Sequence, residues 1–280
     1  MKYLLSICFI VLSLNLEAQV QTPQPSPSVT LNQVVGLTNF EVKYSSPSMR
    51  DRKIFGDLVP YDKLWRTGAN KNTTINFDDD IIFGDNEVMK GEYAIFTIPK
   101  ENKWTVYLYK NTENWGTPEK WNESQIAAEV DVETNMVEPA FESFNISFGH
   151  FTKNSAHLMI TWENTSAHIL VEVPTDKKVM KSIEMTMSNP SANDMYRAAV
   201  YFLETDRDIN QAKMWIDKAM SMQKTEPFWM LRQQSLIYAK AGEKQKAIEI
   251  AQRSLEAAKE ANNADYVKMN KESLKEWGAY

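Results

Sequence analysis

The sequence contains very little cysteine and histidine. Its 280 residues include one cysteine and three histidines. A disulfide framework needs paired cysteines, and a structural zinc site needs about four Cys or His ligands close together. The composition therefore excludes a disulfide scaffold and a zinc-finger type of domain. The histidines, His150, His157 and His168, have no metal-ligand spacing, so we expect neither a metal nor a cofactor.

Several catalytic motifs and an excess of positive charge are also missing. The sequence has no Gly-x-Ser-x-Gly elbow, no phosphate-binding loop, no Gly-x-Gly-x-x-Gly and no His-Glu-x-x-His. A serine or cysteine hydrolase is the class most clearly disfavoured. The formal net charge of −6 argues against nucleic-acid binding, which relies on Lys and Arg at the phosphates.

The one long hydrophobic run lies at the N-terminus. It extends from Leu4 to Leu16, follows Lys2 and ends near Ala18. About 20 apolar residues are needed to span a bilayer, so the run is too short for a membrane span. Its layout is that of a signal peptide over residues 1–18, which predicts Sec-dependent export to the periplasm or the outside of the cell. The Pro-rich residues 19–28 then predict an extended linker.

What remains has the composition of a globular protein of two parts. The chain is 43% hydrophobic and 24% charged. Counted along the sequence, residues 1–176 carry 14 basic and 23 acidic side chains, a net of −9. The remaining residues carry 17 and 14, a net of +3, and the two sums give −6. This shift predicts two units with a boundary near Pro174.

Residues 29–174 show a hydrophobic period of two, which is typical of strands. Phe40, Val42 and Tyr44, for example, alternate with Glu41 and Lys43. Further strands are expected around residues 104–108 and 144–148, and over 28–35, 72–77, 80–84, 92–98, 155–162 and 167–173. Nine short strands without long helices predict an antiparallel β-sandwich or barrel, and of the two we expect the sandwich. The polar run at residues 163–166 predicts a hairpin between the last two strands, in which His157 and His168 would not be paired.

Residues 175–280 change to a helical period of 3.6. Ser191 with Asp194 has the form of a capping box, Asp208 can cap the next helix, and Gly242 suits the residue after a helix end. The helical hairpins superpose at an offset of 35 residues, which places small residues of one hairpin on small residues of the other. This pattern resembles the tetratricopeptide (TPR) repeat. The fold class expected for the whole chain is therefore α+β: a β-sandwich domain followed by a TPR-like helical array.

One connection inside the β-domain is rich in residues suited to ligand binding. Residues 50–70 carry two glycines, several aromatic residues and no strand alternation. Arginine offers a five-donor fork for a carboxylate or phosphate, flat aromatic rings allow stacking, and asparagine can both donate and accept. The predicted ligand-binding residues are Arg52, Tyr61, Trp65, Arg66, Asn70 and, farther along the chain, Glu92. The alternative is structural: Arg66 would pair with an internal acid, and the aromatic rings would fill one end of the sandwich.

A set of motifs in the β-domain resembles a known family. The motifs are Tyr44-Ser45-Ser46-Pro47, Arg52-Lys53-Ile54-Phe55-Gly56, Leu58-Val59-Pro60-Tyr61, Trp65-Arg66-Thr67-Gly68-Ala69-Asn70, Thr73-Thr74-Ile75, Gly91-Glu92-Tyr93, Phe96-Thr97-Ile98-Pro99, Trp104-Thr105-Val106 and Trp115-Gly116. Together they are similar to a bacterial exported family, domain of unknown function 2911 (DUF2911), over roughly residues 29–173. Met89-Lys90-Gly91 stands where the family usually has Pro-Ala-Gly. The resemblance implies an exported β-domain, followed in similar members by helical repeats, and it assigns no catalytic residue.

These observations leave two functional hypotheses. The first is a non-catalytic binding protein of the bacterial envelope. Its β-domain would bind a small polar ligand, and its helical repeats would dock a protein or peptide partner. The second is a small envelope enzyme acting on a sugar or peptide, with Arg66, Asn70 and carboxylates such as Glu92 near the Trp65 loop. We expect binding rather than catalysis.

Overall fold

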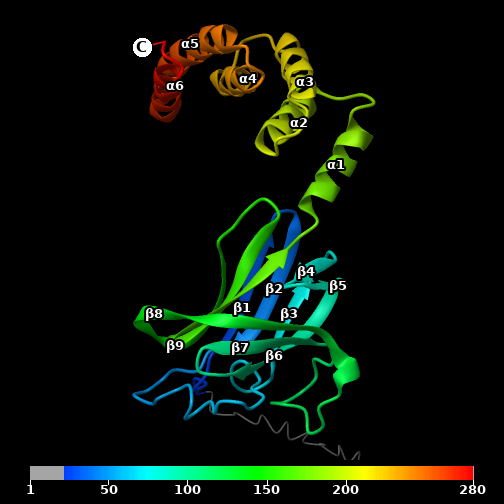
Figure 1. Cartoon of the computed structure of the whole chain (residues 1–280), viewed down its shortest axis with the longest axis vertical. Coiled ribbons are helices and arrows are strands. Elements are labelled where there is room, and N and C mark those ends of the chain that lie inside the picture. Colours follow the sequence, from blue (N-terminus) through cyan, green and yellow to red (C-terminus); the bar gives the residue numbers. More distant parts are fainter. Residues whose placement is uncertain (1–21, 280) are drawn as a thin grey trace, which may run out of the picture. The chain divides into compact units, whose positions relative to one another are not determined.

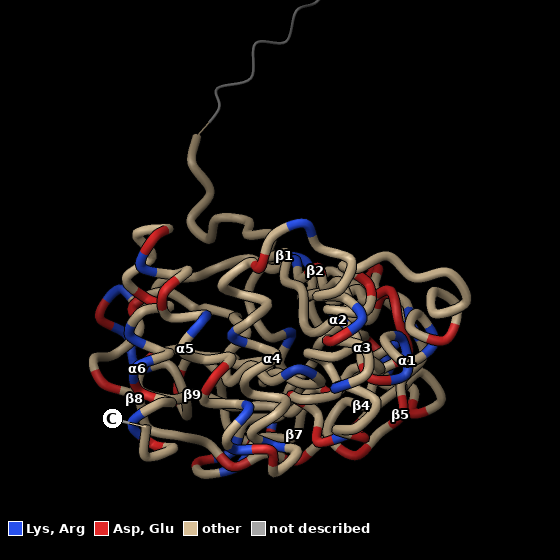
Figure 2. Tube along the Cα trace, turned by 90° about the horizontal axis from the view of Figure 1, so that it is seen from above, with Lys and Arg blue, Asp and Glu red and all other residues tan. Residues whose placement is uncertain are grey.

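The computed structural model describes residues 22–279. The predicted signal peptide and the first residues of the predicted linker lie outside this range. The chain divides into two compact units, one up to Thr175 and one from Asp176. They are called the β-domain and the helical unit below. Figure 1 shows the order of the elements, and Figure 2 marks the charged residues along the trace.

Among the described residues, the β-domain forms nine strands in one antiparallel sheet with the order β1-β2-β3-β6-β7-β8-β9-β4-β5. The strands are β1 (Ser28–Val35), β2 (Thr38–Ser45), β3 (Thr73–Phe77), β4 (Ile81–Phe83), β5 (Asn86–Val88), β6 (Gly91–Pro99), β7 (Lys103–Tyr109), β8 (Ile126–Gly149) and β9 (Ser155–Glu172). A short 3₁₀ turn, Glu123–Gln125, precedes β8.

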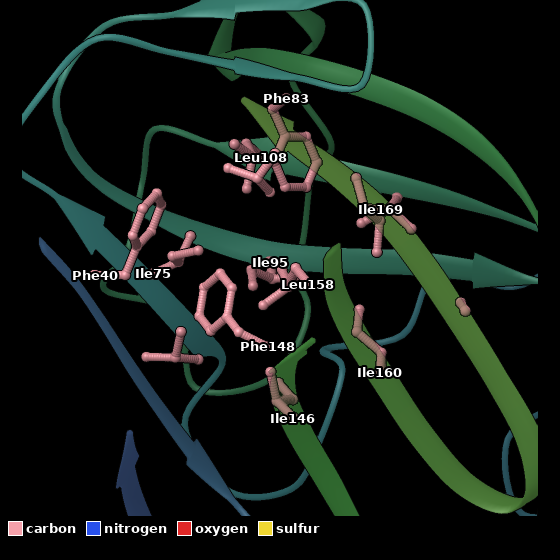
Figure 3. Packing of buried hydrophobic residues seen from close by; sticks show 14 of the residues in the cluster. Phe40, Ile75, Phe83, Ile95, Leu108, Ile146, Phe148, Leu158, Ile160 and Ile169 are labelled. Carbon is pink, nitrogen blue, oxygen red and sulfur yellow. The ribbon is translucent and has the colours of Figure 1, made fainter. Parts of the chain in front are cut away.

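The sheet folds over so that its two halves face one core. Phe40, Ile75 and Ile95 come from β2, β3 and β6, and Ile146 and Ile160 from β8 and β9. All five belong to one buried hydrophobic cluster, and Figure 3 shows them converging on the same interior. This is the sandwich arrangement that the period of two predicts, and the alternation exists because successive strand residues point to opposite faces.

Strands β8 and β9 join the two halves. The first part of β8 pairs with β7 and the rest with β9, so one long strand belongs to both layers. The prediction of a hairpin at residues 163–166 was wrong. The residues before and after this run belong to one strand, β9, and both parts pair with β8. The polar run instead marks a sharp bend: Glu163 has a φ of +54°, and the hydroxyl groups of Thr161 and Ser166 lie 2.7 Å apart.

The helical unit contains six helices. They are α1 (Thr175–Thr186), α2 (Ala192–Glu204), α3 (Ile209–Ser221), α4 (Phe228–Lys240), α5 (Lys244–Glu260) and α6 (Ala264–Glu276). The Ser191–Asp194 capping box and the Asp208 cap are present at the starts of α2 and α3. Gly242, with a φ of +82°, follows α4 as predicted. The two units therefore confirm an α+β fold class, whereas the TPR-like assignment stays a prediction.

Small residues allow neighbouring helices of this unit to pack closely. Ala212 and Ala219 of α3 and Ala247 and Ala251 of α5 are fully buried. These helices pack against α2 and α4 respectively, as the offset of 35 residues requires. Lys, Arg, Asp and Glu are interspersed along α5 and α6 (Figure 2). No helix within residues 22–279 combines the length and apolar composition needed to cross a membrane.

Candidate functional site

The connection between β2 and β3 is an ordered loop with an unusual backbone. Arg50, Asp51, Asp62, Thr67 and Asn70 all have φ values between +50° and +60°. A left-handed conformation costs a non-glycine residue of order 1 kcal/mol or more and persists only where the surroundings hold it. Several such residues in one loop point to a shape that the fold maintains.

Hydrogen bonds hold this loop on the sheet at both ends. Trp65 and Thr97 of β6 exchange two backbone hydrogen bonds of 2.8 and 3.0 Å, and the Thr67 hydroxyl lies 3.2 Å from that of Thr97. Near the other end, Met49 N–H donates to the Glu142 carbonyl of β8 at 2.7 Å. The loop thus connects strands from both halves of the sheet.

A cavity of about 380 Å³ lies between this loop, the residues before β1 and strand β9. Its lining consists of Pro25, Ser26, Pro47, Ser48, Arg50, Arg52, Leu58, Val59, Trp65, Arg66, Gly68, Ala69, Asn70 and Trp162. Three of these residues are arginines and none is an aspartate or a glutamate. The cavity walls are therefore positively charged.

Backbone carbonyl groups hold the three guanidinium groups. Arg66 donates to the Asn70 carbonyl at 2.7 Å, and Arg50 donates to the Pro25 carbonyl at 2.8 Å. Arg52 donates to the carbonyls of Met49 and Ser48 at 2.8 and 2.7 Å. Within residues 22–279, none of the three forms an ion pair with a carboxylate. Each guanidinium has five N–H donors, so donors remain for a ligand while the carbonyls fix the orientation.

An aromatic cluster packs against the cavity and contributes Trp65 and Trp162 to its lining. The Trp65 ring lies 5.4 Å from Phe144 in an edge-on contact and stacks on Trp162 at 6.1 Å between ring centroids. Phe55 and Trp104 complete the cluster. Trp162 is only 1% exposed, whereas Trp65 keeps a partly exposed face. The aromatic rings do fill one end of the sandwich, but Arg66 has no acidic partner within residues 22–279. Of the structural alternative, the aromatic packing is therefore present, whereas the ion pair of Arg66 with an acid is not found within residues 22–279.

Asn70 attaches the segment before β1 to the cavity. Its side-chain amide donates to the Ser45 hydroxyl at 3.2 Å and to the Ser26 carbonyl at 3.4 Å. The Ser46 backbone N–H donates to the Pro27 carbonyl at 2.9 Å. The last residues of the predicted linker therefore form one wall of the cavity instead of a free tether.

Comparison with known proteins assigns the β-domain to a family. A family model described as a protein of unknown function (DUF2911) matches residues 26–171, which contain the whole cavity except Pro25. The chain belongs to the DUF2911 family. Comparisons with curated proteins and with solved structures found no match.

Two of the residues predicted to bind a ligand lie away from this DUF2911 cavity. Glu92 is exposed on β6, opposite Asn76, and acts electrostatically on Lys43. Tyr61 packs against the core and beside Gly56 without lining the cavity. Burial raises the pKa of its hydroxyl, with smaller contributions from Glu101 and Glu163. The predicted residues that the DUF2911 fold brings together are Arg52, Trp65, Arg66 and Asn70, and Arg50 joins them.

The Asp78–Asp80 run of the DUF2911 domain has a structural explanation. The Asp78 carboxylate accepts hydrogen bonds from the backbone and side-chain amides of Asn39 at 2.9 and 2.6 Å. Asp79 accepts from the Thr38 hydroxyl at 2.8 Å, and Asp80 from the Lys90 backbone N–H at 2.9 Å. These carboxylates hold the turn between β3 and β4.

The structure also gathers the three histidines, which the sequence did not predict. The rings of His150 and His157 have centroids 5.3 Å apart, and those of His150 and His168 are 5.7 Å apart. His157 and His168 are separated by 6.4 Å. The prediction that these two are not paired depended on the incorrect hairpin at residues 163–166. The bend in β9 brings them together, and the polar run at residues 163–166 did not distinguish such a bend from a hairpin turn.

Proposed function

We propose that this DUF2911 protein is a non-catalytic binding protein that holds a small anionic ligand in the arginine-lined cavity. The observation that supports the proposal most is the set of three guanidinium groups, Arg50, Arg52 and Arg66, held by carbonyls around one cavity without an acid in its lining. A ligand carboxylate or phosphate would supply the missing negative charge, because guanidinium groups bind both with two parallel hydrogen bonds.

The size of the cavity limits the ligand. A volume of about 380 Å³ falls in the lower part of the range of small-molecule sites. The exposed face of Trp65 offers an apolar surface beside Arg66, and the Asn70 side chain keeps acceptor capacity. A small ring-shaped acid, such as an acidic sugar or a sugar phosphate, fits this combination of charge and flat apolar surface.

The alternative, a small envelope enzyme, has less support at this cavity. General acid and base catalysis needs carboxyl groups at the reacting bond, yet the lining contains no Asp or Glu. Two carboxylates of the neighbouring strands accept from backbone amides of the loop: Glu163 of β9 from the N–H groups of Ile54 and Phe55, and Glu142 of β8 from that of Arg50. We therefore rank binding above catalysis here.

We also propose that the protein is exported and that its helical unit docks a partner. Export through a signal peptide over residues 1–18 would place the cavity in the periplasm or outside the cell. The helical unit would dock a protein or peptide partner, as TPR-like hairpins do. The supporting features are the repeated hairpins and exposed apolar side chains such as Met214 on α3 and Trp229 on α4.

The binding proposal is tested by thermal unfolding in the presence of matched anionic and neutral compounds. Glucuronate, glucose 6-phosphate and inorganic phosphate are compared with glucose. The anions should raise the melting temperature of the wild-type chain, and added salt should reduce the effect. The double substitution Arg50→Gln/Arg52→Gln should abolish this effect, because it removes two of the three guanidinium groups of the cavity lining. Both side chains are exposed, so their loss leaves the core intact.

The matched control is Lys53→Gln, which removes a positive charge from the same segment but not from the cavity lining. Lys53→Gln should keep the anion effect. An equal effect of glucose and glucose 6-phosphate, or an anion effect that survives the loss of both arginines, would contradict the proposal.

A further inference from the structure

The histidine cluster lies in the β-domain where the β8–β9 hairpin turns. His150 follows directly after β8 and is exposed with a φ of +52°. His157 lies in β9 opposite Gly149, and His168 lies in β9 beyond the bend. All three histidines of the sequence therefore lie within 6.4 Å of one another, measured between ring centroids. None of them lines the arginine-lined cavity.

The spacing of the rings is close to that of three imidazoles around one ion. Zinc binds imidazole nitrogen at about 2.0–2.1 Å, so three ligands at tetrahedral angles would have ring centroids roughly 5 to 5.5 Å apart. The observed separations are 5.3, 5.7 and 6.4 Å. No group of three or more His, Cys, Asp or Glu side chains within residues 22–279 is arranged to hold a metal ion in this structure. An approach of about 1 Å between the rings of His157 and His168 separates these centroid distances from those of a three-histidine site.

The hydrogen bonding leaves ring nitrogens for such a role. His157 Nδ1 is buried and has no hydrogen-bond partner within residues 22–279. His168 Nε2 lies 2.9 Å from the Ser166 hydroxyl, which in turn lies 2.7 Å from that of Thr161. A hydrogen bond from one ring nitrogen orients the other nitrogen toward a metal, as in many zinc sites.

We propose that His150, His157 and His168 form a binding site for a divalent transition-metal ion of the zinc type. Imidazole is a ligand of borderline softness and suits Zn²⁺, Cu²⁺ and Ni²⁺, whereas Ca²⁺ and Mg²⁺ prefer oxygen. The exposed His150 supplies one ligand from the loop after β8, and the side chains of His157 and His168 must approach each other to close the site. A water molecule would occupy the fourth position, as in zinc sites with three protein ligands.

The test is a zinc titration of the chain from residue 19, prepared without a histidine tag. Isothermal titration should give one Zn²⁺ per chain. His150→Asn should weaken binding at least tenfold, and asparagine is tolerated at positive φ, so the loop should keep its shape. Phe151→Ala is the matched control, because Phe151 is the exposed neighbour of His150 on the same loop, and it should leave the affinity unchanged.

A spectroscopic measurement covers the case in which a variant folds poorly. Co²⁺ added to the wild-type chain should give the intense visible absorption of tetrahedral coordination, and one equivalent of Zn²⁺ should remove it. The proposal is overturned if the wild-type chain binds no Zn²⁺ at about 1 mM, since a useful three-ligand site binds more tightly than that. It is equally overturned if His150→Asn binds as tightly as the wild type, because the ion would then lie elsewhere.

Discussion

At the scale of single residues, the cavity depends on positions where the backbone takes a left-handed conformation. Arg50 and Asn70 have φ values of +50° and +58°, and each holds part of the segment before β1. The sequence indicated Arg66 and Asn70 as a pair because both types recognise polar groups. It could not show that the Asn70 carbonyl would bind Arg66, since that contact follows from the turn between them.

Residue types alone also do not show which side chains lie at the cavity. Glu92 follows the loop in the sequence, but it lies exposed near the start of β6, opposite Asn76, and does not line the cavity. Arg50 was not selected, although it stands two residues before Arg52 and lines the same cavity. Loop geometry decides which of several neighbouring charged side chains faces a cavity. The hydrophobic period of the sequence carries no information about it.

Gly36 provides a test of packing at the residue scale. It turns the chain between β1 and β2 with a φ of +56°, and a Cβ there would lie 1.9 Å from the Thr175 hydroxyl. Gly36→Ala should lower the free energy of unfolding by about 2 kcal/mol, from backbone strain, from this contact and from an approach of 2.7 Å to the Lys153 carbonyl oxygen. The measurement is urea unfolding followed by circular dichroism.

The control is the same substitution in a Thr175→Ala background. The Thr175 hydroxyl is buried without a partner within residues 22–279, so removing it should cost little. Gly36→Ala should then be less harmful. An identical loss in both backgrounds would show that the contact with Thr175 is not responsible.

At the scale of elements, helix ends were the most predictable features. Capping is a local property, because the side chain that satisfies the first free N–H groups stands within three residues of them. Ser191, Asp208 and Gly242 therefore appear where the sequence placed them. The bend in β9 was missed for the opposite reason: the run at residues 163–166 is compatible with a turn, and only pairing of both parts of β9 with β8 decides against it.

The capping box of α2 makes a prediction about acid. Hydrogen bonds from the Ser191 hydroxyl and backbone N–H lower the pKa of Asp194 below its usual value, with a further contribution from Arg197. A carboxylate whose pKa is lowered by folding stabilises the folded state above its ordinary pKa and loses that effect as the pH falls through the lowered value. Asp194→Asn should therefore destabilise the helical unit at pH 7 and have little effect below about pH 3.

The measurement is thermal unfolding of both proteins, followed by circular dichroism at 222 nm between pH 2 and pH 7. Melting temperatures should differ at neutral pH and converge in acid. A constant difference across this range would mean that the Asp194 charge is not what stabilises the start of α2.

At the scale of the whole molecule, the chain has separate hydrophobic cores. The main cluster of the β-domain contains no residue from the helical unit, and the clusters of the helical unit contain none from the β-domain. The change of hydrophobic period near residue 174 was enough to predict two kinds of structure. The pairing order of nine strands was not predictable, because β4 and β5 join the sheet beside β9, far along the chain.

The separate cores predict that the β-domain folds alone. A fragment of residues 22–175 should show the β-sheet signal in circular dichroism and a cooperative thermal transition. It should also retain the anion effect of the full chain, because every residue that lines the cavity lies within it. A fragment that stays unfolded would show that the β-domain needs the helical unit for stability.

The central claim is that Arg50, Arg52 and Arg66 together bind an anion, and nuclear magnetic resonance of the arginine side chains tests it most directly. In the fragment of residues 22–175, glucose 6-phosphate should shift the Nε–H signals of these three arginines along one saturable curve, while glucose should leave them unchanged. Signals that do not move at millimolar glucose 6-phosphate, or that move equally with glucose, would contradict the account.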